Sequence, residues 1–192
     1  MSKSVVTKNA PTRGFARERV LDAALELFAK HGVHGTSLQM IADRLGVGKG
    51  AVYYQFQSKD EIALAVVLPI FEDIEHLIRI GELLPTREAQ RDVAVSGLVE
   101  LAIRHRRISS LFYGDPTLHQ IVESHGEYKS IIERFSALLL GPDPDTATRV
   151  SMSMATAGIY ACATDSALAD ISDDELRTIL LACSKRCADP LS

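Results

Sequence analysis

Apolar residues recur every three or four positions along most of this chain, which is the period of an amphipathic α-helix. The first clear stripe consists of Val20, Ala24, Leu27 and Phe28. It predicts a helix from about residue 15 that ends at Gly32, because a glycine commonly terminates a helix. Every other element that the pattern predicts is also a helix. We therefore expect an all-α fold.

Residues 36–56 predict two short helices joined by a tight turn. Thr36 is placed to cap the first helix, and Gln39 three residues later would complete a capping box. Gly46 would end that helix in a left-handed conformation. The second helix, about residues 49–55, is too short to be stable alone, so we expect packing to hold it in place. This arrangement is a helix-turn-helix.

The second of these helices presents polar groups that suit DNA. Its outward residues are a cation, a glycine, two hydroxyl-bearing rings and an amide: Lys49, Gly50, Tyr53, Tyr54 and Gln55. Cations and hydroxyl groups bind backbone phosphates, and amides read base edges in the major groove. The helix-turn-helix therefore indicates a DNA-binding element.

Together with residues 20–28 before it and 56–61 after it, this segment resembles the DNA-binding domain of TetR-family transcriptional regulators. The resemblance covers about residues 16–68. It implies an all-helical homodimer that binds a palindromic operator and releases it when a small molecule enters the second domain. Gly48 departs from the family pattern, which usually has Ser or Thr there, and Gln55 stands where His is common.

The residues that we predict to contact DNA lie in this segment. They are Thr36, Ser37, Gln39, Gly48, Lys49, Gly50, Tyr53, Tyr54, Gln55 and Lys59. Lys59 lies in the first turn of the next helix, where Ser58 and Glu61 form a second capping box and free N–H groups could bind a phosphate.

The rest of the chain predicts a helical body. A long helix runs from Ser58 to about Glu82, and Pro69 should kink it or end its first half. Another helix starts at Pro85 and Thr86. Short elements follow over residues 108–124, and then come a helix that ends at Gly141, a helix over about 145–168 and a helix over about 173–187.

The short elements are rich in aromatic and histidine residues, and imperfectly packed helices are where pockets form in bundles. We therefore expect a ligand pocket there. Its candidate lining residues are Phe71, Leu101, His105, Phe112, Tyr113, His119, Tyr128, Met152 and Tyr160. The alternative is that these side chains only fill the core.

The last two helices carry stripes that could pair two copies of the chain. Small residues follow one another at helical spacing in the first, and apolar residues do so in the second. The candidate interface residues are Ala155, Gly158, Cys162, Ser166, Leu176, Ile179, Leu180 and Cys183. A single chain could also bury both stripes within itself. The resemblance favours pairing, because TetR-like proteins dimerise through their terminal helices.

Charge divides the chain into two parts. Residues 1–60 hold 9 Lys+Arg and 5 Asp+Glu, a balance of +4, whereas the remaining 132 residues hold 12 and 20, a balance of −8. A basic head on an acidic body is expected when only the head touches DNA. We predict a DNA-binding domain over residues 1–60 and a ligand-binding and dimerisation domain over 61–192. Residues 1–14 are either a frayed terminus or a basic arm along DNA.

The remaining features point to a soluble cytoplasmic protein. Three cysteines without a secretory signal suggest free thiols in a reducing compartment. The most apolar stretch, residues 150–169, is dense in Ser and Thr and contains Asp165, so we do not expect a membrane span. No targeting segment is evident.

No catalytic motif is present in the sequence: we find no nucleophile motif, phosphate loop or CxxC pair, and we predict no enzyme activity and no cofactor. His119 and Glu123 share a helix face near His125, but two spaced ligands are a weak sign of a metal site, and we assign none. Two alternatives to a ligand-responsive repressor stay open. One is a DNA-binding regulator whose body binds a protein partner or acts as an activator module, and the other is a helical enzyme or carrier.

Overall fold

The computed structural model describes residues 13–188, and all regular elements in that range are helices. The all-α prediction is therefore confirmed. The helices are α1 (Arg13–Gly35), α2 (Leu38–Leu45), α3 (Lys49–Gln55), α4 (Lys59–Glu82), α5 (Arg87–Arg104), α6 (Arg106–Gly114), α7 (Pro116–Glu123), α8 (Gly126–Leu140), α9 (Thr146–Thr164) and α10 (Asp173–Ala188), with a 3₁₀ turn η1 (Ser166–Leu168). The expected basic arm lies almost wholly outside the described residues.

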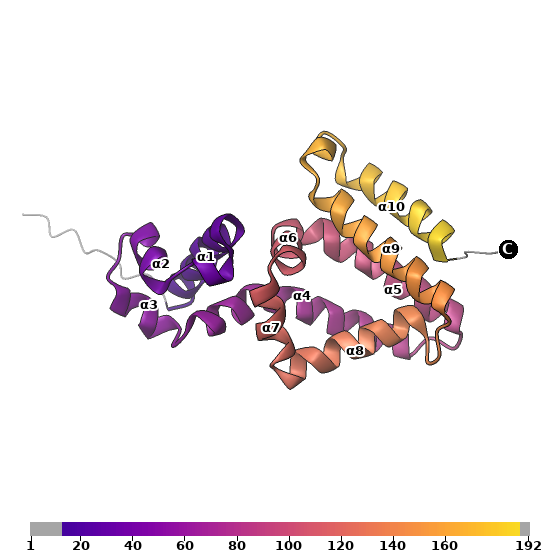
Figure 1. The fold of residues 1–192 in the computed structure, drawn as a ribbon, viewed down its shortest axis with the longest axis horizontal. Coiled ribbons are helices and arrows are strands. Elements are labelled where there is room, and N and C mark those ends of the chain that lie inside the picture. The colour runs from indigo at the N-terminus through magenta and orange to yellow at the C-terminus, as the bar shows by residue number, and fades with distance from the viewer. Residues whose placement is uncertain (1–12, 189–192) are drawn as a thin grey trace, which may run out of the picture.

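Helices α1, α2 and α3 form a small head at one end of the molecule (Figure 1). Val20, Ala24 and Phe28 of α1 are buried, as the apolar stripe predicts. They pack in one core with Ile41 of α2 and Val52 of α3. The short helices α2 and α3 are therefore held in place by burial of their apolar side chains and not by their own stability.

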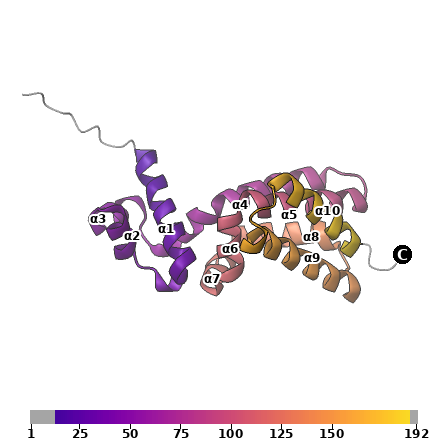
Figure 2. The same cartoon turned by 90° about the horizontal axis from the view of Figure 1, so that it is seen from above.

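The remaining helices form a larger body, and α4 runs from the head into it (Figures 1 and 2). Helix α5 lies inside the body in contact with α4, α8, α9 and α10. Its buried residues include Leu98, Val99 and Ala102. Helices α6 and α7 lie where the body meets the head and contact α1. None of the helices within residues 13–188 is long and apolar enough to cross a bilayer.

Two of the predicted glycine terminations are confirmed by backbone conformation. Gly46 follows α2 with φ 68° and ψ 31°, which is left-handed. Gly32 has φ 72° and ψ 164°, and it interrupts α1 before a last short turn that runs to Gly35. A side chain would be strained at either position, because L-residues rarely adopt a positive φ.

The predicted cap of α2 is wrong by one residue. Ser37 is the N-cap, and its hydroxyl accepts a hydrogen bond from the Met40 N–H at 3.2 Å. The Thr36 hydroxyl instead donates to the Gly32 carbonyl at 2.8 Å, and Thr36 is buried. The Gln39 side chain donates to Asp43, so it closes no capping box.

The predicted cap of α4 is confirmed. Ser58 caps α4 by accepting from the Glu61 N–H at 3.0 Å, while the Glu61 carboxylate accepts from the neighbouring Gln57 N–H at 2.7 Å.

Two helices differ in length from the expectation. Helix α4 continues through Pro69 to Glu82, so it does not end near Leu68. The helix predicted over 145–168 ends earlier, at Thr164, and a 3₁₀ turn follows it.

Candidate nucleic-acid interface and ligand pocket

Helix α3 has one buried face and one exposed face. Val52 is fully buried, and the Phe56 side chain that follows the helix is fully buried too. Tyr53 and Tyr54 point to solvent, with 45% and 70% of their surface exposed. The helix is thus fixed by its apolar side and presents its polar side outward, as expected from the sequence.

The exposed face of α3 combines charge, rings and open backbone. The Lys49 ammonium lies 5.4 Å from the centroid of the Tyr53 ring. A side chain added at Gly48 or Gly50 would meet no atom within 4 Å, so the backbone there is open to a large partner. Gly48 is the N-cap of α3 and makes no side-chain cap, so that helix end lacks the hydroxyl that Ser or Thr would supply.

The other residues of the predicted DNA surface lie around α3. Ser37, the N-cap of α2, and Gln39 within that helix are exposed, and Gln55 is half-buried. The Lys59 ammonium donates to the His34 carbonyl at 3.1 Å, which ties the start of α4 to the end of α1. Thr36 does not belong to this surface, because its side chain is 2% exposed.

Arg17 is a surface cation that the sequence analysis did not select. Its guanidinium donates to the Gln55 carbonyl at 3.2 Å and lies 4.0 Å from the centroid of the Phe56 ring. It therefore places a charge from α1 beside the end of α3. Periodicity marks Arg17 only as a solvent-facing residue, so no local signal could have identified its neighbours.

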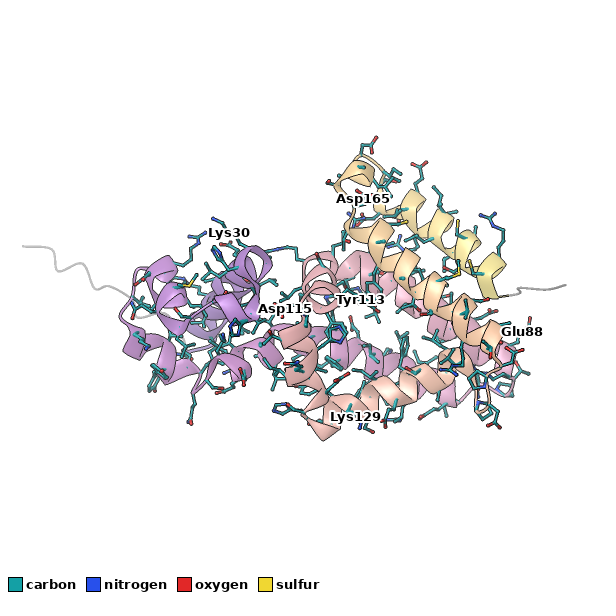
Figure 3. The ribbon with its side chains drawn as sticks, viewed as in Figure 1. Lys30, Glu88, Tyr113, Asp115, Lys129 and Asp165 are labelled. Atoms are coloured by element: carbon teal, nitrogen blue, oxygen red, sulfur yellow. The ribbon has the colours of Figure 1, made fainter. Side chains whose placement is uncertain are left out.

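The body contains a cavity of about 850 Å³ between α4, α6, α7, α8 and α9, and Leu98 of α5 also lines it. Its walls are mainly aliphatic and aromatic, and it has the size of a site for a small organic molecule. Six of the nine predicted residues line it: Phe71, Phe112, Tyr113, His119, Met152 and Tyr160. Figure 3 shows Tyr113 on α6, in the space between the helices of the body.

Three predicted pocket residues have other roles. Leu101 is buried in α5 away from the cavity lining. His105 donates a 2.8 Å hydrogen bond from its Nε2–H to the Asp73 carboxylate of α4, and this bond is the main cause of the lowered pKa of the Asp73 carboxyl. The Tyr128 ring packs against Phe71, with centroids 4.6 Å apart.

Several lining residues were not predicted from the sequence. Ser109 precedes Phe112 and Tyr113 by three and four positions, so the three share one face of α6 and all line the cavity. Glu123 and Arg149 also line it, and both are exposed. The spacing of Ser109 was a usable signal, but a lone serine in an amphipathic helix carries little weight.

Two tyrosines meet at one wall of the cavity. The ring centroids of Tyr113 and Tyr160 are 3.8 Å apart, and their hydroxyl groups share a hydrogen bond. Desolvation raises the pKa of Tyr160 to about 12 and raises the pKa of Tyr113 further. Both hydroxyls therefore stay neutral and paired with each other.

Asp115 connects the body to the head. One carboxylate oxygen caps α7 by accepting from the Thr117 and Leu118 N–H groups at 2.8 and 3.0 Å. The other oxygen accepts from the Val33 N–H, at the end of α1, at 2.6 Å. Asp115 is buried, and Figure 3 shows it between the head and α6–α7. One side chain thus fixes an end of the head to two helices that line the cavity.

The histidines near this region form no metal cluster within residues 13–188, where no group of three potential ligands is found. His119 packs on Phe112, with ring centroids 4.7 Å apart. The Nδ1 atom of His125 lies 2.7 Å from the Ile121 carbonyl.

Helices α9 and α10 present an exposed apolar strip. Gly158, Ile179 and Cys183 of the predicted interface are exposed, as is Ser166 in the 3₁₀ turn, and Cys162 is half-buried. Ala155, Leu176 and Leu180 are instead buried within the chain. Met154, Ala161 and Ala182 are exposed too and were missed. Periodicity identified both helix faces without showing which of them the chain itself covers.

Comparison with known proteins gives a consistent result. Residues 20–66 match the family described as bacterial regulatory proteins, tetR family. The HTH-type transcriptional regulator RutR from Escherichia coli O157:H7 is 33% identical over 138 residues, and the match covers 65% of this chain and 60% of RutR's own length.

Two crystal structures share the fold. A TetR-like transcriptional regulator from Rhodococcus sp. RHA1 has a TM-score of 0.65 at 22% identity, over 95% of this chain and 100% of that one. The regulator FadR from Bacillus subtilis, in complex with stearoyl-CoA, has a TM-score of 0.59 at 17% identity, over 91% and 99%. At these identities the likeness concerns the fold alone.

Proposed function

Because the chain belongs to the tetR family of bacterial regulatory proteins, we propose that it is a ligand-responsive transcriptional repressor that binds a palindromic operator as a homodimer. The observation that carries this proposal is the exposed face of α3, which lies inside the matched segment. Its buried side fixes the helix, and its outer side offers Lys49, Tyr53 and Tyr54. These groups suit a phosphate backbone.

Within this proposal the residues of the head divide by role. Lys49, Tyr53, Tyr54 and Lys59 contact phosphates, and Gln39, Gly50 and Gln55 lie nearest the base edges. The open backbone at Gly50 supports the second assignment, because it allows a close approach to the floor of the groove.

A palindrome is read by two heads, so the proposal requires a dimer. The strip on α9 and α10 supports this, because Met154 and Ile179 are 66% and 44% exposed on adjacent antiparallel helices. Exposed apolar residues that form one contiguous patch mark interaction sites. Gly158 lies in the same strip, where a second helix could approach closely.

The cavity supports a small-molecule effector. FadR from Bacillus subtilis holds stearoyl-CoA, which is a precedent for ligand binding in this fold. In this chain α6 and α7 both line the cavity and contact α1, and Asp115 fixes their junction to Val33. A ligand that moves this junction would alter the position of the head and so lower the affinity for DNA. By linkage, bound DNA must then lower the affinity for the ligand by the same factor.

The second candidate is a regulator whose body binds a protein partner and no small ligand. The exposed strip on α9 and α10 would suit that role as well, since nothing about its chemistry is specific to a second copy. The cavity favours the effector, because a site of about 850 Å³ with mainly apolar walls has no purpose in a body that only docks a protein.

The test is selection of bound duplexes from a pool of random DNA, with the retained DNA sequenced. We expect an inverted repeat whose half-sites lie one helical turn apart, or about 34–36 Å. Gln55→Ala should relax the preference at one position of each half-site, at a cost of about 1–3 kcal/mol for a bidentate contact. Retention of DNA without any enriched motif would refute the proposal.

A further inference from the structure

The residues that line the cavity divide into a buried floor and an exposed mouth. The floor comes from α4, α5 and α8 and is apolar, as at the buried side chains of Val67, Phe71, Leu98, Phe135 and Leu139. Most of the exposed lining residues lie instead on one face of α9: Thr146, Arg149, Val150, Ser153 and Ala157. The cavity therefore opens beside α9 and is closed by hydrocarbon at its base.

The mouth holds a cation without a partner in the protein. Arg149 is exposed near the start of α9, and none of the hydrogen bonds or ion pairs within residues 13–188 involves its guanidinium. The Thr146 and Ser153 hydroxyls, three residues before it and four after it, are likewise exposed and unpartnered in that range. Residues at these spacings are neighbours on a helix surface. One guanidinium and two hydroxyls thus lie together at the mouth as free hydrogen-bond donors.

The acid of the lining and the nearest acid along the chain both leave Arg149 unpaired. Glu123 ends α7, three residues before α8 begins, whereas Arg149 lies beyond the far end of α8. The 15 residues of α8 span about 22 Å, so these two charges stand at opposite ends of the cavity. Asp145 is closer to Arg149 in the chain, but its carboxylate caps α9 by accepting from the Thr148 N–H at 2.7 Å.

An oxyanion at Arg149 gains more than a cation would gain at Glu123. His119 lies one turn before Glu123 on α7 and lines the cavity too, so that end holds a base that is positive when protonated. At the other end a guanidinium and two hydroxyls can all donate to one oxyanion, and hydrogen bonds to ionised groups are about twice as strong as neutral ones. The charge that the cavity selects is therefore negative.

We propose that the effector is an amphipathic anion, with an apolar part that fills the buried floor and a terminal carboxylate or other singly charged oxyanion held at the mouth by Arg149, Thr146 and Ser153. The inference rests on the proposed ligand-responsive function, and it adds the chemical class of the ligand and the residue that selects its charge. Because the head group stays at the exposed mouth, it keeps part of its hydration while the apolar part leaves water.

The test uses displacement of N-phenyl-1-naphthylamine, a neutral dye that fluoresces in apolar surroundings. Three competitors share one unbranched alkyl chain and differ in the head group: decanoate, 1-decanol and decyltrimethylammonium. At neutral pH we expect decanoate to displace the dye at the lowest concentration and decyltrimethylammonium to need the highest, because only the carboxylate can accept from the donors at the mouth.

Two variants separate the role of Arg149 from general effects of charge. Arg149→Gln should reduce the advantage of decanoate over decanol by roughly tenfold or more, the value of a hydrogen bond to a charged group. Arg107→Gln is the matched control, because Arg107 is also an exposed arginine of the body without a recorded partner in residues 13–188, but it does not line this cavity. It should leave the advantage unchanged. Thermal melts verify that both variants are folded.

Three results would overturn the inference: no binding of the dye, displacement by decanol or decyltrimethylammonium at concentrations as low as those of decanoate, or an unchanged advantage of decanoate in folded Arg149→Gln. These titrations contain no DNA, so they can fail while the random-pool selection still yields a palindrome. They can equally succeed in a protein that selects no DNA sequence, which separates this inference from the proposed function.

Discussion

At the scale of single residues, the exposed cation on α3 should act through the DNA backbone. Lys49→Ala removes a charge that lies above the Tyr53 ring, on the face that we propose meets DNA. It should weaken binding to all sequences alike and lower the slope of log K against log salt by about 1.

The matched control is Lys30→Ala, which removes the same charge from an exposed position of α1, as labelled in Figure 3. Binding measured over a series of salt concentrations should give the wild-type slope for this variant. Equal slopes for the wild type and Lys49→Ala would place Lys49 outside the interface.

Asp115 allows a second test at this scale. In Asp115→Asn the amide oxygen can still cap α7, since Asn is a good N-cap, but the amide nitrogen faces the Val33 N–H and cannot accept from it. We expect a loss of about 1–3 kcal/mol in the free energy of unfolding. Hydrogen exchange should accelerate at Val33 and stay slow at Leu118.

Asp145→Asn is the control for this change. Asp145 also caps a helix, α9, by accepting from the Thr148 N–H, and among residues 13–188 the recorded hydrogen bonds of its carboxylate go only to Thr148 of that same helix. The Asp145→Asn variant should lose less of its free energy of unfolding than the Asp115→Asn variant loses. Unchanged exchange at Val33 in Asp115→Asn would show that the head is held by other contacts.

At the scale of elements, the strip on α9 and α10 should hold the dimer together. Gly158→Arg adds a bulky charge where, within one chain, an added side chain meets no atom within 4 Å. The variant should therefore fold normally and sediment as a monomer, because an unpaired buried charge is costly at an interface. Operator affinity should fall with the loss of the second half-site.

Gly126→Arg is the comparison for this variant. Gly126 likewise has open space around an added side chain, but it begins α8. That variant should remain dimeric. A Gly158→Arg protein that also stays dimeric would place the interface elsewhere on the surface.

The helix boundaries also show what the sequence can specify. Glycines with positive φ and Ser or Asp caps act within a few residues, so Gly32, Gly46 and Ser58 were identified correctly. Thr36 and Ser37 are adjacent and chemically similar, and only burial of Thr36 in the folded head decides between them. The 3₁₀ turn after Thr164 was missed because Asp165 both ends α9 and caps the turn.

At the scale of the whole molecule, contacts between distant segments were beyond a single sequence. Asp115 and Val33 are 82 residues apart, and no periodic pattern connects them. The apolar stripe of α10 was visible, yet Leu176 and Leu180 face the chain's own core while Ile179 faces outward. Phe112, Tyr113 and His119 line the cavity as expected, because aromatic and histidine residues gather in the short helices α6 and α7. His105 instead pairs with Asp73 of α4, a contact between helices that the sequence does not show.

The division of the chain into a DNA-binding head and a ligand-binding body remains a proposal. The body would hold two heads at a fixed separation, since α4 runs from the head into the body that carries the α9–α10 strip (Figure 1). This predicts that operator binding depends on the distance between half-sites and not only on their sequence.

The most direct measurement of the central claim is therefore the affinity of the wild-type protein for the selected inverted repeat and for the same repeat with 5 base pairs inserted at its centre. That insertion turns the half-sites by about half a helical repeat of 10–10.5 base pairs, so one dimer cannot reach both. We expect affinity for the altered duplex to fall by roughly a thousandfold or more, to the level of random DNA. Equal affinity for the two duplexes would contradict reading of the operator by two heads held in one dimer.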